Sequence, residues 1–407
     1  MPHDIIVLNN HIKLIHKQIN SPISHLGVLV NVGTRDEEEN LNGIAHFVEH
    51  VIFKGTTHRK GYQVIRRMED VGGDLNASTS KEETWFHSSF LSADYQRAID
   101  LLSDIFFNST FPEKEMAKEK DVVYEEIKYY CDTPSELIFD EIEEQVFQGH
   151  PLGRAVLGSK KSVKGIQRDD ILAFTRQHYT NPHIVIASVG NISPKKLTSL
   201  CNRYFGIHQL EDKPHSRIPF STYTPKEIVK HKNTNQTHLV MAVPALSLFD
   251  NNRHVLMLLT NLLGGQGMNT RLNMTIREKL GLAYTVEANY TPYSDSGLFS
   301  IYAGCDNNLW QKCIDLSFKE LEKVKTTKLG LMQLHYTRKQ FLGQLAIAQE
   351  SKLNEMLSLG RSTLFYDQVD TTEETIAAIE AITAKQIMEV ANQLFIKDNF
   401  STLIYTK

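Results

Sequence analysis

One order of secondary-structure elements occurs twice along this chain of 407 residues. In each half, strands precede a helix, a further helix, two paired strands and another helix. The first set is expected at 22–33, 43–55, 62–71, 74–91 and 94–107, and the second at 226–244, 251–263, 270–280, 283–304 and 307–324. The repetition predicts a duplicated α+β fold, in which two similar domains each contain a mixed or mainly antiparallel sheet packed by helices.

A polar segment separates the two halves. Residues 208–226 include three prolines and show neither helical nor strand periodicity. We therefore expect an N-terminal domain at 1–210, a linker at 211–225 and a C-terminal domain at 226–407. Further elements of the first half are expected as a hairpin near 5–14, helices at 112–130, 137–148 and 168–179, and a buried strand at 184–191.

Composition and charge argue against several classes of protein. The formal net charge is −4 and no large basic block occurs, so nucleic-acid binding is not expected. No stretch approaches the roughly 20 apolar residues of a membrane span. The four cysteines form no C-x-x-C pair, which favours reduced thiols, and the N-terminus lacks signal or transit features, so we expect a cytoplasmic protein. The acidic run DEEE at 36–39 is expected to be a solvated turn.

The string HFVEH carries the chemistry of the first half. His46 and His50 are four positions apart, so on a helix they lie on one face and can direct ring nitrogens at one metal ion. Glu49 borders the same face and can reach a water on that metal without displacing either histidine. This arrangement is the inverzincin motif H-x-x-E-H, the reversed form of the zinc-protease motif H-E-x-x-H.

The segment EKEMAKEKDVVYEEIKYY offers a third ligand on another helix. A catalytic zinc takes three protein ligands and keeps one position open for water. Glu119 and Glu126 are seven positions apart and share a helix face with Val122 and Val123, so either carboxylate is a candidate. Glu125 is rotated by about 100° from Glu126 and is expected to face solvent.

These motifs resemble those of the pitrilysin/insulinase-type zinc metallopeptidases, in the short two-domain branch that includes mitochondrial processing peptidases. GIAHFVEHVIFKGT is similar to the family's G-x-A-H-F-x-E-H-M-x-F-K-G-T, with Val51 in place of the usual methionine. The family's spacing selects Glu126, 76 positions after His50, as the third zinc ligand. The resemblance also implies that Glu119 supports a zinc-bound histidine.

Two further segments carry the resemblance. GGDLNASTSKEET is similar to the family's G-G-x-x-N-A-x-T-x-x-E-x-T, which implies that Asn76 and Ala77 bind substrate as an added β-strand. NTRLNMTIREKLGLAYTV resembles S-R-L-x-x-x-x-R-E-x-x-G-L-A-Y, which places Arg277 and Tyr284 on the family's Arg/Tyr pair. A guanidinium and a phenol are donors suited to an oxyanion. The alternatives to these roles are that Tyr284 is a core residue and that Arg277 is an exposed helix residue without a function in the site.

The resemblance implies a zinc metalloendopeptidase that hydrolyses peptides or unfolded segments inside a closed chamber, with Zn²⁺ as cofactor and Glu49 as general base. The family builds its chamber from four such domains, so two chains are needed. We expect a homodimer; a heterodimer with a motif-deficient partner, as in processing peptidases, is the rival assembly. A non-catalytic structural subunit or a peptide-binding protein is the rival function, and the complete motif argues against the former.

Overall fold

The computed structural model describes residues 5–213 and 216–407, and its chain divides into two compact units. Unit 1 consists of 1–127, 155–217 and 346–371, and unit 2 of 128–154, 218–345 and 372–407. The units are therefore not the contiguous stretches 1–210 and 226–407, because each half of the sequence contributes a segment to the other half's unit. The sequential division, with its linker at 211–225, stays a proposal about the two repeated halves.

Unit 1 is built on a six-stranded sheet in the order β1-β2-β6-β3-β5-β4. Its strands are β1 (Ile6–Val7), β2 (Lys13–Gln18), β3 (Ile23–Val30), β4 (Asn76–Thr79), β5 (Thr84–Leu91) and β6 (Ile184–Gly190). Only the β2–β6 pair is parallel. Strand β6 is buried along its whole length, as its apolar sequence predicts for a central strand.

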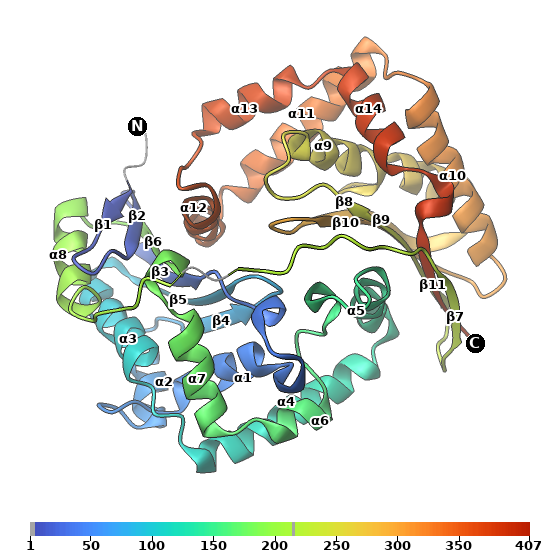
Figure 1. Ribbon diagram of the computed structural model, residues 1–407. Helices are drawn as coiled ribbons and strands as arrows, with labels where there is room; N and C mark the ends of the chain where they lie inside the picture. Colours follow the sequence, from blue (N-terminus) through green and yellow to red (C-terminus); the bar gives the residue numbers. More distant parts are fainter. Residues whose placement is uncertain (1–4, 214–215) are drawn as a thin grey trace. The chain divides into compact units, whose positions relative to one another are not determined.

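Helices cover both faces of this sheet. They are α1 (Ile44–Val51), α2 (Gly61–Glu69), α3 (Tyr95–Asn108), α4 (Glu113–Cys131), α6 (Lys160–Gly165), α7 (Arg168–His178), α8 (Pro194–Tyr204) and α12 (Lys352–Tyr366). Helix α12 lies on the face opposite α1 to α3 (Figure 1). A Cβ atom at Gly360 would lie 2.4 Å from the Trp85 ring, so glycine is what permits this close packing.

Unit 2 is built on a five-stranded sheet in the order β7-β11-β8-β10-β9. Its strands are β7 (Glu227–His231), β8 (Thr237–Ala245), β9 (Ala283–Pro292), β10 (Gly297–Cys305) and β11 (Ser401–Thr406). The expectation of a strand pair at 226–244 is wrong in one respect. The C-terminal strand β11 lies between β7 and β8, parallel to the first and antiparallel to the second.

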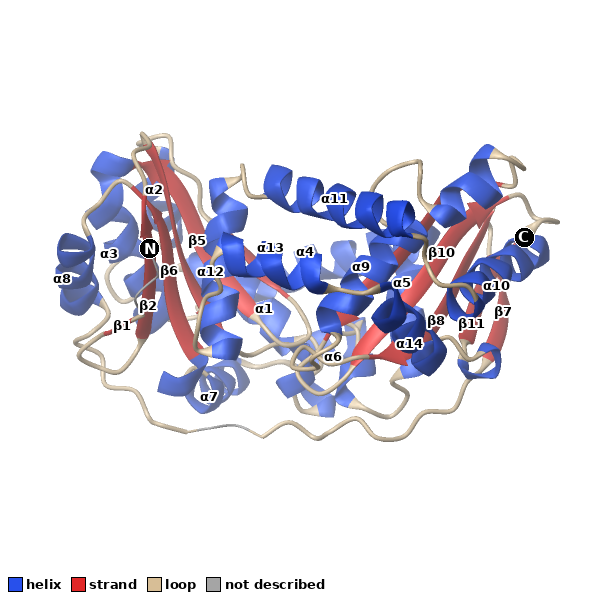
Figure 2. Cartoon of the chain, turned by 90° about the horizontal axis from the view of Figure 1, so that it is seen from above, coloured by secondary structure: helices blue, strands red, loops and turns tan. Residues whose placement is uncertain are grey.

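Helices also cover the second sheet, shown with the first in Figure 2. They are α5 (Pro134–Val146), α9 (Arg253–Gly264), α10 (Trp310–Thr326), α11 (Leu331–Ala348), α13 (Thr372–Ala381) and α14 (Ala384–Leu394). Residues Asn273–Glu278, expected within an α-helix, form a π-helix. No helix in the described residues is both long enough and apolar enough to cross a membrane.

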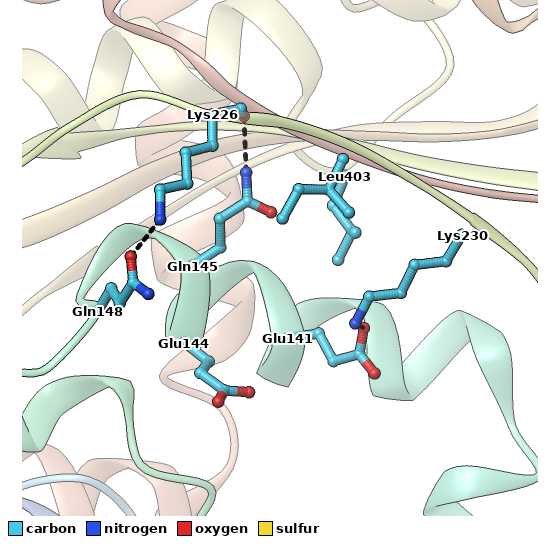
Figure 3. A pocket seen from close by; sticks show the side chains of 8 residues that line it. Glu141, Glu144, Gln145, Gln148, Lys226, Lys230 and Leu403 are labelled. Atoms are coloured by element: carbon cyan, nitrogen blue, oxygen red, sulfur yellow. Dashed lines mark hydrogen bonds and ion pairs between the residues drawn. The ribbon is translucent and has the colours of Figure 1, made fainter.

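Helix α5 is fastened to the edge of the second sheet. The Gln145 side chain donates a hydrogen bond from Nε2 to the Lys226 carbonyl oxygen at 2.6 Å, and Glu141 pairs with Lys230 at 2.5 Å. Figure 3 shows these side chains around a cavity of about 200 Å³ that Ile228 and Leu403 also line. Helix α5 thus belongs to unit 2 although it precedes the linker in sequence.

The duplicated fold is confirmed by strand order. The series β2-β6-β3-β5-β4 and β7-β11-β8-β10-β9 match strand for strand, and in each series the first two strands form the parallel pair. The last strand of each series, β4 or β9, is an edge strand. Both sheets are mixed and mainly antiparallel, as the sequence predicts.

Candidate metal centre

Helix α1 begins at a capped N-terminus. Gly43 precedes the helix with a φ of 94°, a conformation that favours glycine. The Glu37 carboxylate accepts hydrogen bonds from the backbone N–H groups of Gly43 at 2.8 Å and Ala45 at 2.9 Å. A carboxylate is favourable there because the first N–H groups of a helix have no partner within it. The expectation of a solvated turn at 36–39 is therefore wrong for Glu37, which is buried.

Removing this cap is expected to destabilise the fold. Glu37→Ala leaves two buried N–H groups without their acceptor, which should lower the free energy of unfolding by about 1–3 kcal/mol. Urea denaturation measures the change. Glu39→Ala, an exposed neighbour, is the control and should stay within about 0.5 kcal/mol of wild type. Equal effects of the two substitutions would contradict the cap.

Three ligand atoms from α1 and α4 converge on one point. The side chains of His46, His50 and Glu126 form the one group of three or more metal-type ligands found among the described residues, with one atom from each within 4.8 Å of the others. Glu126 Oε2 lies 3.6 Å from His46 Nε2 and 3.4 Å from His50 Nε2. Ligand atoms at about 2.0–2.2 Å from a tetrahedral zinc are roughly 3.3–3.6 Å apart. The spacing therefore fits a shared zinc ion.

The protonation states of these groups also suit a cation. Burial and the neighbouring His50 lower the pKa of His46 to about 4, so its imidazole is neutral at pH 7. The hydrogen bond from His50 lowers the pKa of Glu126. Burial alone would lower the pKa of His50, but Glu126 and Glu119 together raise it. The two carboxylates thus draw a proton to His50, and a metal cation at this point would take that proton's place.

Glu119 lies beside the ligand group and not within it. Its Oε2 lies 3.4 Å from His50 Nδ1, while its Oε1 forms an ion pair with Lys54 Nζ at 2.7 Å. This contact leaves His50 Nε2 as the nitrogen that faces Glu126. An outer carboxylate of this kind fixes the tautomer and the ring orientation of a metal-binding histidine. Lys54 is not among the site residues expected from the sequence motifs.

Glu49 is held by one hydrogen bond. Its Oε2 accepts from Thr79 Oγ1 at 2.6 Å, the one hydrogen bond that the described residues make to this carboxylate. Burial raises the pKa of Glu49, and the bond from Thr79 opposes that rise. A half-buried carboxylate with a raised pKa beside a metal centre is suited to take up and release a proton.

Strand β4 carries Thr79 and the predicted substrate residues. Ala77 packs against the core of unit 1, and Asn76 points to the opposite, exposed face. Strand β4 pairs with β5 on one side and ends the sheet on the other. An edge strand offers unpaired backbone groups to an extended chain. A substrate role for Asn76 and Ala77 stays a prediction.

Arg277 and Tyr284 belong to unit 2. Arg277 lies in the π-helix, its side chain 42% exposed and 3.7 Å from the Glu278 carboxylate. Tyr284 is the second residue of β9 and is 72% exposed, which excludes the alternative of a core tyrosine. Both side chains are accessible to a ligand. Their role as oxyanion donors stays a prediction.

Similar sequences extend over most of the chain. A family model described as insulinase (peptidase family M16) matches residues 13–160, and one described as peptidase M16 inactive domain matches 165–341. A Bacillus subtilis protein named uncharacterized zinc protease YmxG is 32% identical over 93% of this chain and 92% of its own length.

Solved structures share the fold. A protease from Helicobacter pylori has a TM-score of 0.91, with 20% identity and 100% of both chains covered. The peptidase M16 inactive domain from Pseudomonas fluorescens has a TM-score of 0.93, with 20% identity, covering 100% of this chain and 98% of that one. At this level of identity, the likeness establishes the architecture of two α+β units.

Proposed function

Because this chain belongs to the insulinase family, peptidase family M16, we propose that it is a zinc-dependent endopeptidase that hydrolyses peptides or unfolded segments. The observation that carries the proposal is the convergence of His46, His50 and Glu126 beside Glu49. Two histidine side chains, bound in their neutral form, and one carboxylate form the ligand set of many catalytic zinc sites. The relative named a zinc protease supports the choice of metal.

Each residue of the proposed site has its own role in peptide hydrolysis. Zinc held by the three ligands supplies a Lewis acid and a water of lowered pKa. Glu49 takes the proton of the attacking water and passes it to the leaving amine. Glu119 keeps the His50 ring oriented. Arg277 and Tyr284 donate hydrogen bonds to the oxyanion.

Substrate recognition is assigned to the edge of the first sheet. We propose that an extended peptide pairs with β4 at Asn76 and Ala77, because this strand lies at the edge of the sheet and contacts α1. Backbone pairing of this kind selects extended chains with little regard to sequence. Unfolded segments and short peptides therefore suit the site better than folded proteins.

We further propose a cytoplasmic homodimer that encloses substrate in a chamber. One chain supplies two of the four domains that such a chamber needs, and it carries both the ligand set and the Arg277/Tyr284 segment. Two copies would thus form two complete sites, with Arg277 and Tyr284 directed at the partner's ligand set. Light scattering of the purified protein tests the assembly, and a monomer that is fully active would contradict it.

Chelation tests the proposed activity. Purified protein should hold about one zinc per chain and cleave a pool of unstructured peptides. Dipicolinate should abolish both, and stoichiometric zinc should restore both. Zinc binding without cleavage would favour a peptide-binding protein or the catalytic half of a heterodimer. Protein that binds no zinc would favour a non-catalytic structural subunit and contradict the proposal.

A further inference from the structure

Thr79 is the residue through which the first sheet contacts the catalytic carboxylate. Its Oγ1 donates to Glu49 Oε2 at 2.6 Å, and no other described side chain hydrogen-bonds that carboxylate. A carboxylate on a helix can rotate about its side-chain torsions, and a single short hydrogen bond from a fixed strand restricts that rotation. The bond occupies Oε2 and leaves Oε1 free to accept a proton.

The strand that presents this hydroxyl is itself firmly held. The turn after β4 is closed by a bond from Ser80 N–H to the Glu83 carbonyl oxygen at 2.8 Å. Its two glutamates, Glu82 and Glu83, are each 6% exposed. Glu82 pairs with Arg35 at 2.6 Å, and Glu83 pairs with Arg361 of α12. One buried ion pair from Arg35 and a second, partly exposed one from Arg361 therefore tie the turn after β4 to two distant segments and restrict where Thr79 points.

The backbone of Thr79 faces the free edge of the sheet. Asp74 N–H bonds to the Ser89 carbonyl oxygen, and Ser80 N–H to that of Glu83. In an antiparallel ladder, hydrogen-bonded and non-hydrogen-bonded pairs alternate, so the even-numbered residues of β4 direct their backbone groups at β5. The N–H and C=O groups of Ala77 and Thr79 consequently point away from β5, towards the position of an added strand.

We propose that Thr79 is a positioning residue that couples substrate docking on β4 to the orientation of Glu49, an inference that rests on the proposed peptidase function. The side chain of Thr79 holds the base, while its backbone pairs with the incoming peptide. A peptide in register on β4 therefore settles beside an already oriented Glu49. Thr79 acts through Glu49 and takes no part in the chemical step itself.

Hydroxyl-free variants test the proposal. Thr79→Val keeps the shape and strand propensity but removes the donor, so kcat should fall about tenfold to a hundredfold, part of the 10²–10⁴ that an oriented base contributes. KM should stay within about twofold, and the zinc content should be unchanged. Thr79→Ser keeps the donor and should restore kcat to within about threefold of wild type. Thr79→Ala, a smaller hydroxyl-free variant, should match Thr79→Val.

Thr198→Val is the matched control, since it removes a threonine hydroxyl that donates to the Pro194 carbonyl oxygen within α8, outside β4 and the ligand group. It should leave kcat and KM unchanged. A Thr79→Val protein with wild-type kcat overturns the inference. A Thr79→Ser protein whose kcat is no higher than that of Thr79→Val also overturns it, and so does a fall in kcat that is accompanied by loss of zinc. A wild type that cleaves no peptide overturns the proposed function, whereas an active wild type with an active Thr79→Val overturns this inference alone.

Discussion

Replacing Glu49 with glutamine is expected to lower kcat by about two to four orders of magnitude while leaving zinc content and folding at wild-type levels. The amide has nearly the same shape and can still accept the hydrogen bond from Thr79, but it cannot take up a proton. Hydrolysis of a quenched fluorescent peptide gives kcat, and atomic absorption gives the zinc content.

Glu39→Gln is the control for the loss of one negative charge, because Glu39 is exposed and lies outside the site. It should keep wild-type kcat. If Glu49→Gln kept more than about a tenth of the wild-type kcat, this result would contradict the assignment of Glu49 as general base. The water would then need another base near the ligand group.

The second large effect is expected at Glu126. Glu126→Gln exchanges an anionic ligand for a neutral one, so zinc affinity should fall by at least about a hundredfold and cleavage should fall with it. Competition with a chromogenic chelator measures the affinity. Glu125→Gln removes the same charge from the adjacent, exposed position of α4 and should change neither quantity. Equal losses in the two variants would show a general charge effect and contradict a ligand role for Glu126.

The helix faces that carry the candidate ligands could be predicted because they depend on local periodicity. A separation of four on α1 and of seven on α4 fixes which side chains share a face, which makes His46, His50, Glu119 and Glu126 candidates. The family resemblance, and not the periodicity, selects Glu126 as the ligand and Glu119 as its support. The partners that orient them were not predictable in this way. Thr79 is far from Glu49 in sequence, and its bond to the base requires the pairing of β4 with β5.

The elements of the fold were predicted better than their arrangement. The strands and helices expected before residue 324 lie close to their ranges, except that Asn273–Glu278 is a π-helix, whereas α6 and α8 have no counterpart among the expected elements. The insertion of β11 between β7 and β8 was not anticipated, since strand pairing over long separations leaves no mark in local periodicity. The expectation of a solvated Glu37 is wrong for a related reason. A charged residue in a polar run looks solvated until the helix N-terminus that it caps is placed beside it.

Helix α5, from the first half of the sequence, belongs to unit 2, and helix α12, from the second half, belongs to unit 1. This arrangement affects how the two halves would stay associated if the chain were cut between them. Helix α12 supplies Met356 and Leu359 to the cluster that covers Ile15, Leu29 and Val185 of the first sheet. A protease nick between residues 211 and 225 would therefore leave each fragment bound to the other through a helix that it had donated. By the same reasoning, fragment 1–210 made alone would expose this apolar face and tend to aggregate, so a gene split there would need both products in the same cell.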